Sequence, residues 1–166
     1  MGNKILYINA CVREASRTRQ LAEYALTFLD GEVTEFDLEK EKLPSLDREL
    51  LASRDDLIAD GAYDADRFIY ARTFAQADTI LIAAPFWDLS FPSSLKVFLE
   101  HIMVSGLTFD YTPEGEPIPS CRAERIIYIS TAGGPVYSRE FSFGYICHLA
   151  ETFWQIPRCE YFCAEG

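Results

Sequence analysis

Short apolar runs alternate with segments of helical spacing along the whole chain, and this alternation limits the possible folds more than any other feature. Predicted strands lie at residues 4–9, 32–38, 78–84, 125–131 and 159–166. Predicted helices lie at residues 16–29, 65–77, 93–103 and 141–153, with short surface helices across residues 39–66. Strands separated by helices pair in parallel through right-handed crossovers. The pattern therefore predicts an α/β protein with helices on both faces of an open sheet.

The most apolar predicted strands belong in the middle of that sheet, where both faces are buried. These are the strands at 4–9, 78–84 and 125–131, which predicts a five-stranded parallel sheet of order 2-1-3-4-5, the flavodoxin-like arrangement. Without a repeat or a linker, residues 1–166 are expected to form a single domain. The chain ends directly after the last predicted strand, where such a domain usually adds a helix. Two interpretations are open: a tail has been lost, or a partner subunit covers that face.

Charge and cysteine usage exclude several classes of protein. The chain has 26 acidic and 15 basic residues and a net charge of −11, so we expect no nucleic-acid partner and no anionic lipid partner. No apolar run reaches the roughly 18 residues that a membrane span needs, and no leader precedes the first strand; a cytoplasmic protein is expected. The five cysteines form no CxxC pair, which favours reduced, mostly buried thiols over a metal site.

The loop after the first predicted strand, NACVREASRTRQL at residues 9–21, has the features of a phosphate site. It has neither GxGxxG nor the phosphate-loop GxxxxGK pattern, which argues against a dinucleotide fold of the usual kind and against an NTPase. Instead Ser16, Arg17 and Thr18 stand where a helix begins, with free backbone N–H groups and the positive end of the helix dipole. Arg13 and Arg19 add two more cations. The alternative is that Ser16 is an ordinary N-cap and the arginines are solvated.

Two further loops meet this one at the carboxyl edge of the predicted sheet, where such folds bind ligands. AAPFWDLSFPSSL at residues 83–95 carries Phe86, Trp87 and Phe91 in a connection, and STAGGP at 130–135 offers two glycines that permit close backbone approach. Aromatic walls beside a phosphate site suit a flat ring on a phosphate tether, which describes flavin mononucleotide (FMN). The alternatives are a subunit interface for the aromatics and a plain turn for the glycines.

These segments resemble a known family. APFWDLSFPSSLKVFLEHIMVSGLTFDYTPEG, supported by SRTRQLAE and STAGG, is similar to the characteristic segment of the flavodoxin-like FMN-dependent NAD(P)H oxidoreductases, specifically the azoreductase and NAD(P)H:quinone reductase group. The resemblance runs from the first strand to the final AEG.

The resemblance implies a set of cofactor-binding residues. The FMN phosphate is expected to bind Ser16, Arg17 and Thr18. The isoalloxazine is expected to lie against Pro85, Phe86, Trp87, Asp88 and Leu89. Its pyrimidine side is expected to meet Thr131, Gly133 and Gly134. A backbone amide near Asp88 or Leu89 is expected to point at flavin N5 and O4. The chain departs from the family at Asp88, where Asn is common, at Ala10, where a hydroxyl residue is common, and at Ala132, which is basic in some members.

The resemblance also implies the activity. Hydride passes from NADH or NADPH to flavin N5, and a quinone, azo or similar aromatic acceptor then takes the electrons, in a ping-pong cycle. The protein is expected to be a homodimer and to need no catalytic acid or base, so His101 and His148 are interpreted as structural. Two other classes stay open: a flavodoxin-type FMN electron carrier, and a noncatalytic redox-sensing module.

Two more features have two interpretations each. Cys11 lies in the phosphate loop, where a helix N-terminus lowers a thiol pKa and makes a redox-sensitive group; packing is the alternative that we favour. Residues 107–120, LTFDYTPEGEPIPS, form either a flap that shapes the acceptor pocket or a connection from helix to strand. The resemblance favours an ordered connection at a dimer interface.

Overall fold

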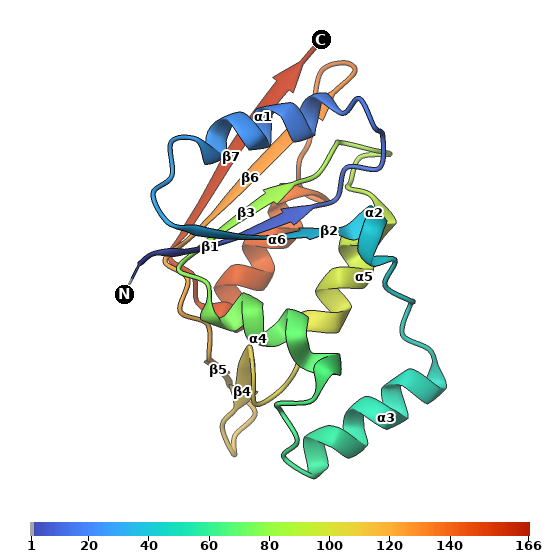
Figure 1. Ribbon diagram of the computed structural model, residues 1–166, viewed down its shortest axis with the longest axis vertical. Helices are drawn as coiled ribbons and strands as arrows, with labels where there is room; N and C mark the ends of the chain where they lie inside the picture. Colours follow the sequence, from blue (N-terminus) through green and yellow to red (C-terminus); the bar gives the residue numbers. More distant parts are fainter. Residues whose placement is uncertain (1) are drawn as a thin grey trace.

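A five-stranded parallel sheet forms the centre of the protein (Figure 1), described for residues 2–166 by a computed structural model. Its strands are β1 (Lys4–Asn9), β2 (Glu32–Asp37), β3 (Thr79–Ala83), β6 (Arg125–Ala132) and β7 (Arg158–Glu165). Their order is β2-β1-β3-β6-β7 and every pairing is parallel. The predicted fold class and strand order are confirmed. The central strands are the most buried, since all five residues of β3 are buried.

The helices are divided unequally between the two faces of the sheet (Figure 1). On one face lies α1 (Arg17–Leu26), and on the other lie α4 (Ile69–Gln76), α5 (Ser93–Ile102) and α6 (Phe143–Leu149). The surface pieces predicted across residues 39–66 are α2 (Leu38–Glu41), α3 (Arg48–Ala59) and the 3₁₀ turn η1 (Asp66–Phe68). A π-helical turn, η2 (Ala150–Trp154), extends α6. The predicted helices are therefore present, although α1 ends three residues before the predicted end at residue 29.

The core has a larger and a smaller half, because three helices cover one face and one helix covers the other. The larger half includes Phe74 and Trp154, whose ring centroids are 4.6 Å apart. The smaller half lies under α1 and includes Tyr7, Leu81 and Ile127. Beside α1, next to the edge strand β7, an open groove of about 650 Å³ is lined by apolar side chains that include Leu21, Phe28 and Phe162. No described element covers this groove, as expected for a sheet without a second helix there.

The connection at residues 107–120 is an ordered antiparallel ribbon of β4 (Phe109–Tyr111) and β5 (Pro117–Pro119). Phe109 packs on Phe153 of η2, with ring centroids 5.0 Å apart. The ribbon lies at the end of the molecule where the sheet strands begin, away from their carboxyl edge (Figure 1). The alternative that it is a flap over this chain's own pocket is therefore wrong; its place in a dimer stays a prediction.

Two kinds of feature are absent from residues 2–166. The longest helix described, α3, has 12 residues, and none is long and apolar enough to span a membrane. Over the same residues, no three side chains of His, Cys, Asp or Glu gather closely enough to bind a metal ion.

Candidate active site

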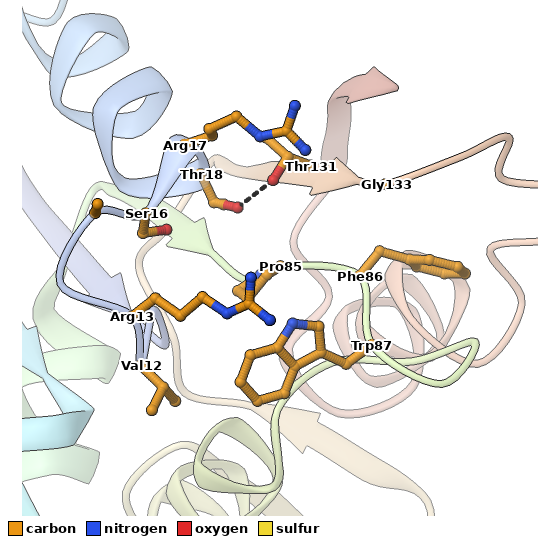
Figure 2. Close-up of a pocket in the computed structure, with 11 residues that line it drawn as sticks. Val12, Arg13, Ser16, Arg17, Thr18, Pro85, Phe86, Trp87, Thr131 and Gly133 are labelled. Carbon is orange, nitrogen blue, oxygen red and sulfur yellow. Dashed lines mark hydrogen bonds between the residues drawn. The ribbon is translucent and has the colours of Figure 1, made fainter. Parts of the chain in front are cut away.

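A pocket of about 290 Å³ opens at the carboxyl edge of the sheet, between the loops that follow β1, β3 and β6 (Figure 2). The chain reverses its strand order here, between β1 and β3, which is where open α/β sheets bind ligands. Its walls are formed by Val12, Arg13, Ala15, Ser16, Arg17, Thr18, Pro85, Phe86, Trp87, Thr131 and Gly133. The predicted site residues thus come together from three loops, except for Asp88, Leu89 and Gly134, which do not line the pocket.

One end of the pocket is the N-terminus of α1. Ser16 is the N-cap, and its Oγ accepts a hydrogen bond from the backbone N–H of Arg19 at 3.2 Å. The amides of a helix's first turn have no intrahelical acceptor, and no acidic side chain in that turn of α1 offsets the dipole. Ser16 therefore caps the helix and also lines the pocket; that it holds a phosphate stays a prediction.

Thr18 and Thr131 join the two sides of this end. Their hydroxyl oxygens are 2.8 Å apart (Figure 2), across 113 residues of sequence, and both residues are buried. Since either hydroxyl can donate, the pair leaves one hydroxyl proton free to turn into the pocket. The bond fixes the start of α1 against the end of β6.

Backbone contacts hold the β1 loop in place. Arg19 Nη2 donates to the carbonyl oxygen of Cys11 at 2.9 Å, and the Cys11 N–H donates to Asn9 Oδ1 at 3.1 Å. Arg19 is thus occupied in supporting the loop, whereas the exposed side chains of Arg13 and Arg17 line the pocket. The cations available to a ligand are therefore two of the three in this loop.

Cys11 is a packing residue. Its side chain is 1% exposed and lies in the smaller half of the core. Burial raises the pKa of the thiol, and this outweighs the hydrogen bond with Ser16 and the charge of Arg19, which both act to lower it. The alternative of a redox-sensitive thiol with a lowered pKa is therefore wrong.

The aromatic side of the pocket comes from the loop after β3. The Phe86 N–H donates to the Thr131 carbonyl oxygen at 3.0 Å, which holds this loop against the end of β6. Phe86 and Trp87 are half-buried, and Arg13 extends towards the Trp87 indole (Figure 2). Phe91, expected to help wall the site, instead packs against Tyr145, with ring centroids 5.9 Å apart. The wall is therefore built from adjacent residues, Pro85 to Trp87.

Asp88 and Leu89 form a tight turn at the tip of this loop. Trp87 and Ser90 exchange backbone hydrogen bonds of 3.1 and 2.8 Å, and the two residues between them have φ of 51° and 66°. Positive φ at both central positions defines a type I′ turn. Such φ values cost an L-residue about 1–2 kcal/mol. Both side chains are exposed, and neither lines the pocket.

Gly133 leaves space that the protein itself does not use. A Cβ placed on Gly133 would meet no atom within 4 Å, and its φ is not in the left-handed region. Neither backbone conformation nor packing therefore requires glycine at this wall. The same is true of Gly134, which lies beyond the pocket lining.

Sequence reasoning did not assign Val12, Arg13 and Ala15 to the lining. Of these three, only Arg13 could have been recognised from the sequence, because it is one of three arginines clustered in this loop of an acidic chain. Val12 and Ala15 carry no sequence feature that indicates a binding site. The two histidines lie outside the pocket. His101 Nε2 is 2.8 Å from the Pro44 carbonyl oxygen, and His148 is exposed on α6, which agrees with their interpretation as structural.

The family model described as flavodoxin-like fold matches residues 3–163. This chain belongs to that family. FMN-dependent NADH:quinone oxidoreductase 2 of Clostridium acetobutylicum is 37% identical to it over 139 residues, which are 80% of this chain and 68% of that protein. FMN-dependent NADH:quinone oxidoreductase of Clostridium perfringens strain ATCC 13124 is 31% identical over 149 residues, covering 86% and 75% of the two chains.

Solved structures of azoreductases share the fold. An azoreductase from Bacillus anthracis strain Sterne superposes with a TM-score of 0.76 at 24% identity, covering 99% of this chain and 87% of the other. An FMN-dependent NADH-azoreductase from B. anthracis strain Ames Ancestor, determined in complex with FMN, gives 0.76 at 21% identity with the same coverage.

Proposed function

We propose that this chain is an FMN-dependent NAD(P)H oxidoreductase that delivers electrons to a quinone, azo or similar aromatic acceptor. One observation carries the proposal: a single pocket joins a helix N-terminus with two free cations to a wall of aromatic side chains. The relatives named FMN-dependent NADH:quinone oxidoreductase support it. A phosphate tethered to a flat ring matches both ends of this pocket at once.

The phosphate end fits FMN by charge and by hydrogen bonding. Backbone amides of Arg17 and Thr18, the hydroxyls of Ser16 and Thr18, and the guanidinium groups of Arg13 and Arg17 would hold the dianion. In a chain of net charge −11, the general field repels an anion. Binding therefore depends on these local donors.

The other end fits the isoalloxazine. Pro85, Phe86 and Trp87 would line the ring, and the open space over Gly133 would let its pyrimidine side approach the backbone. Backbone amides of Asp88 and Leu89, with Thr131 and Gly134, are proposed as further contacts. When bound, FMN supplies the redox chemistry, taking a hydride from the nicotinamide and giving two electrons to the acceptor in alternate half-reactions.

The protein's own part is to orient the reactants and to stabilise charge. Its pocket lining holds no His, Cys, Asp, Glu, Lys or Tyr among the residues described, so no side chain is assigned as acid or base. The donors of the two pocket ends act by preorganised hydrogen bonding instead. We further propose a homodimer, as the family resemblance implies, a cytoplasmic location, and NADH as the first donor to test.

An anaerobic titration of the FMN-loaded protein tests this function. We expect NADH or NADPH to bleach the flavin absorbance stoichiometrically, and a quinone to restore it. FMN binding without bleaching by either donor would favour an electron carrier. Bleaching without recovery on adding quinones or azo compounds would favour a redox sensor, and absence of FMN binding would contradict the assignment of the pocket.

A further inference from the structure

The turn at Asp88 and Leu89 has a sequence that its backbone does not favour. A type I′ turn is best made by Asn-Gly or Asp-Gly, because both central residues need positive φ. Asp tolerates the first position, but Leu89 at φ 66° stands where glycine is preferred. The folded chain gives no reason for a leucine here.

Burial does not offset the strain. Leu89 is 62% exposed, so its side chain gains little from packing within the chain. Strained positions that persist without a packing reason cluster at functional sites. Because Phe86 and Trp87, which lead into this turn, line the pocket, the function that retains Leu89 is expected beside that pocket.

A hydrogen bond joins the turn to a second exposed apolar residue. Ser90 Oγ donates a hydrogen bond to the carbonyl oxygen of Phe141 at 2.6 Å, which joins the β3 loop to the connection before α6. Phe141 is 61% exposed. Leu89 and Phe141 are thus exposed apolar residues of two separate loops that this hydrogen bond joins, and the first of these loops also supplies Phe86 and Trp87 to the pocket.

We propose that Leu89 and Phe141 form an apolar ledge that contacts the planar aromatic acceptor and determines its specificity, favouring bicyclic over monocyclic rings. This inference rests on the proposed function, since it assigns residues that select the acceptor of the same site. A larger ring system buries more apolar area against the two side chains, so it gains more from them.

Reoxidation of the flavin tests the ledge. FMN-loaded protein is reduced with dithionite, mixed anaerobically with 1,4-naphthoquinone or 1,4-benzoquinone, and followed by stopped-flow absorbance. We expect the ratio of the two rate constants, naphthoquinone over benzoquinone, to fall about fivefold in Leu89→Gly and in Phe141→Ala. In the matched control Phe28→Ala, which removes an aromatic side chain that is 70% exposed and lines the groove next to β7 rather than the pocket, the ratio stays unchanged.

A second measurement separates the ledge from a purely structural role. Leu89→Gly relieves the backbone strain, so its melting temperature should rise by about 2 °C while acceptor discrimination is lost. An unchanged ratio in both ledge variants would overturn the proposal; a weakened dimer in sedimentation velocity would then assign Leu89 to a subunit interface. Because dithionite replaces the nicotinamide donor, failure of NADH reduction leaves this test intact. Failure of both quinones to reoxidise the wild-type protein would overturn the proposed function together with the ledge.

Discussion

The two ends of the pocket are built in different ways. At the α1 end, buried hydroxyls of Thr18 and Thr131 and a capped helix set the geometry through hydrogen bonds within the chain. At the β3 end, a strained turn at Asp88 and Leu89 leaves its side chains exposed. The first end is stable by itself and suits tight binding of a fixed anion. The second keeps apolar surface open and suits reactants that come and go.

Of the changes predicted here to separate the two ends of the pocket, filling the space over Gly133 should have the largest effect, on FMN affinity. We expect Gly133→Val to weaken FMN binding on the order of a hundredfold, about 2.7 kcal/mol, because its side chain fills space that the ligand needs. The melting temperature of the apoprotein should stay unchanged, since a Cβ there meets no protein atom within 4 Å. Flavin fluorescence titration and thermal unfolding measure the two quantities. Gly2→Val, at an exposed position before β1 where a Cβ also meets no atom within 4 Å, is the control for FMN affinity, and an equal loss in both variants would contradict the assignment.

Removing a cation should affect only the phosphate end. Arg13→Ala and Arg17→Ala are each expected to lower FMN affinity about tenfold and to leave riboflavin affinity unchanged, because riboflavin lacks the phosphate. Both side chains are exposed, so the loss should shrink at high salt. Titrations with the two flavins at low and high ionic strength check this. A parallel loss of riboflavin binding would place that arginine at the ring.

Breaking the hydroxyl pair should have a smaller effect, on stability. Thr18→Val leaves the Thr131 hydroxyl buried without its partner, which costs about 1 kcal/mol. The expected fall in melting temperature is about 2–4 °C. Thr18→Ser keeps the hydroxyl and should lose less of the stability that depends on this bond. If Thr18→Val and Thr18→Ser had the same melting temperature, and it was higher than that of the wild type, the hydrogen bond between Thr18 and Thr131 would not stabilise the fold.

The smallest predicted effect is a pH dependence remote from the pocket. Burial raises the pKa of the Cys121 thiol to about 12, whereas a thiol in an unfolded chain titrates near 8.5. Above that pH the unfolded state loses a proton that the folded state keeps, so stability falls as pH rises. We expect Cys121→Ser, which keeps a hydrogen-bond donor near the Thr108 carbonyl oxygen, to show a shallower decline in melting temperature between pH 8 and 10. Equal slopes would contradict the raised pKa.

The sheet and the start of α1 at the pocket were predictable from the sequence for physical reasons. Apolar runs such as residues 78–84 are short for a helix and typical of a buried strand. Ser16 before a helical segment is a local signal of a helix start, and it is the N-cap of α1 in the structure. These features depend on neighbours in sequence. Their placement at one edge then follows from the topology of parallel strands.

The β3 end of the pocket was harder to predict, because it depends on contacts between distant segments. The sequence FWDLS at residues 86–90 does not predict positive φ at Asp88 and Leu89, since neither residue is glycine. Phe91 has aromatic neighbours in the sequence, but its side chain packs against Tyr145 of α6 instead of lining the pocket. The pairing of Thr18 with Thr131 spans most of the chain. Such features arise from tertiary packing, which overrides local preference.

The central claim is that one pocket holds a phosphate at one end and a flavin ring at the other. Titrating the wild-type apoprotein with FMN and with riboflavin, by flavin fluorescence at low ionic strength, tests it most directly. We predict that both flavins bind and that FMN binds on the order of a hundredfold more tightly, with the difference shrinking as salt is added. Equal affinities at all salt concentrations would show that the α1 end does not hold the phosphate and would contradict the account.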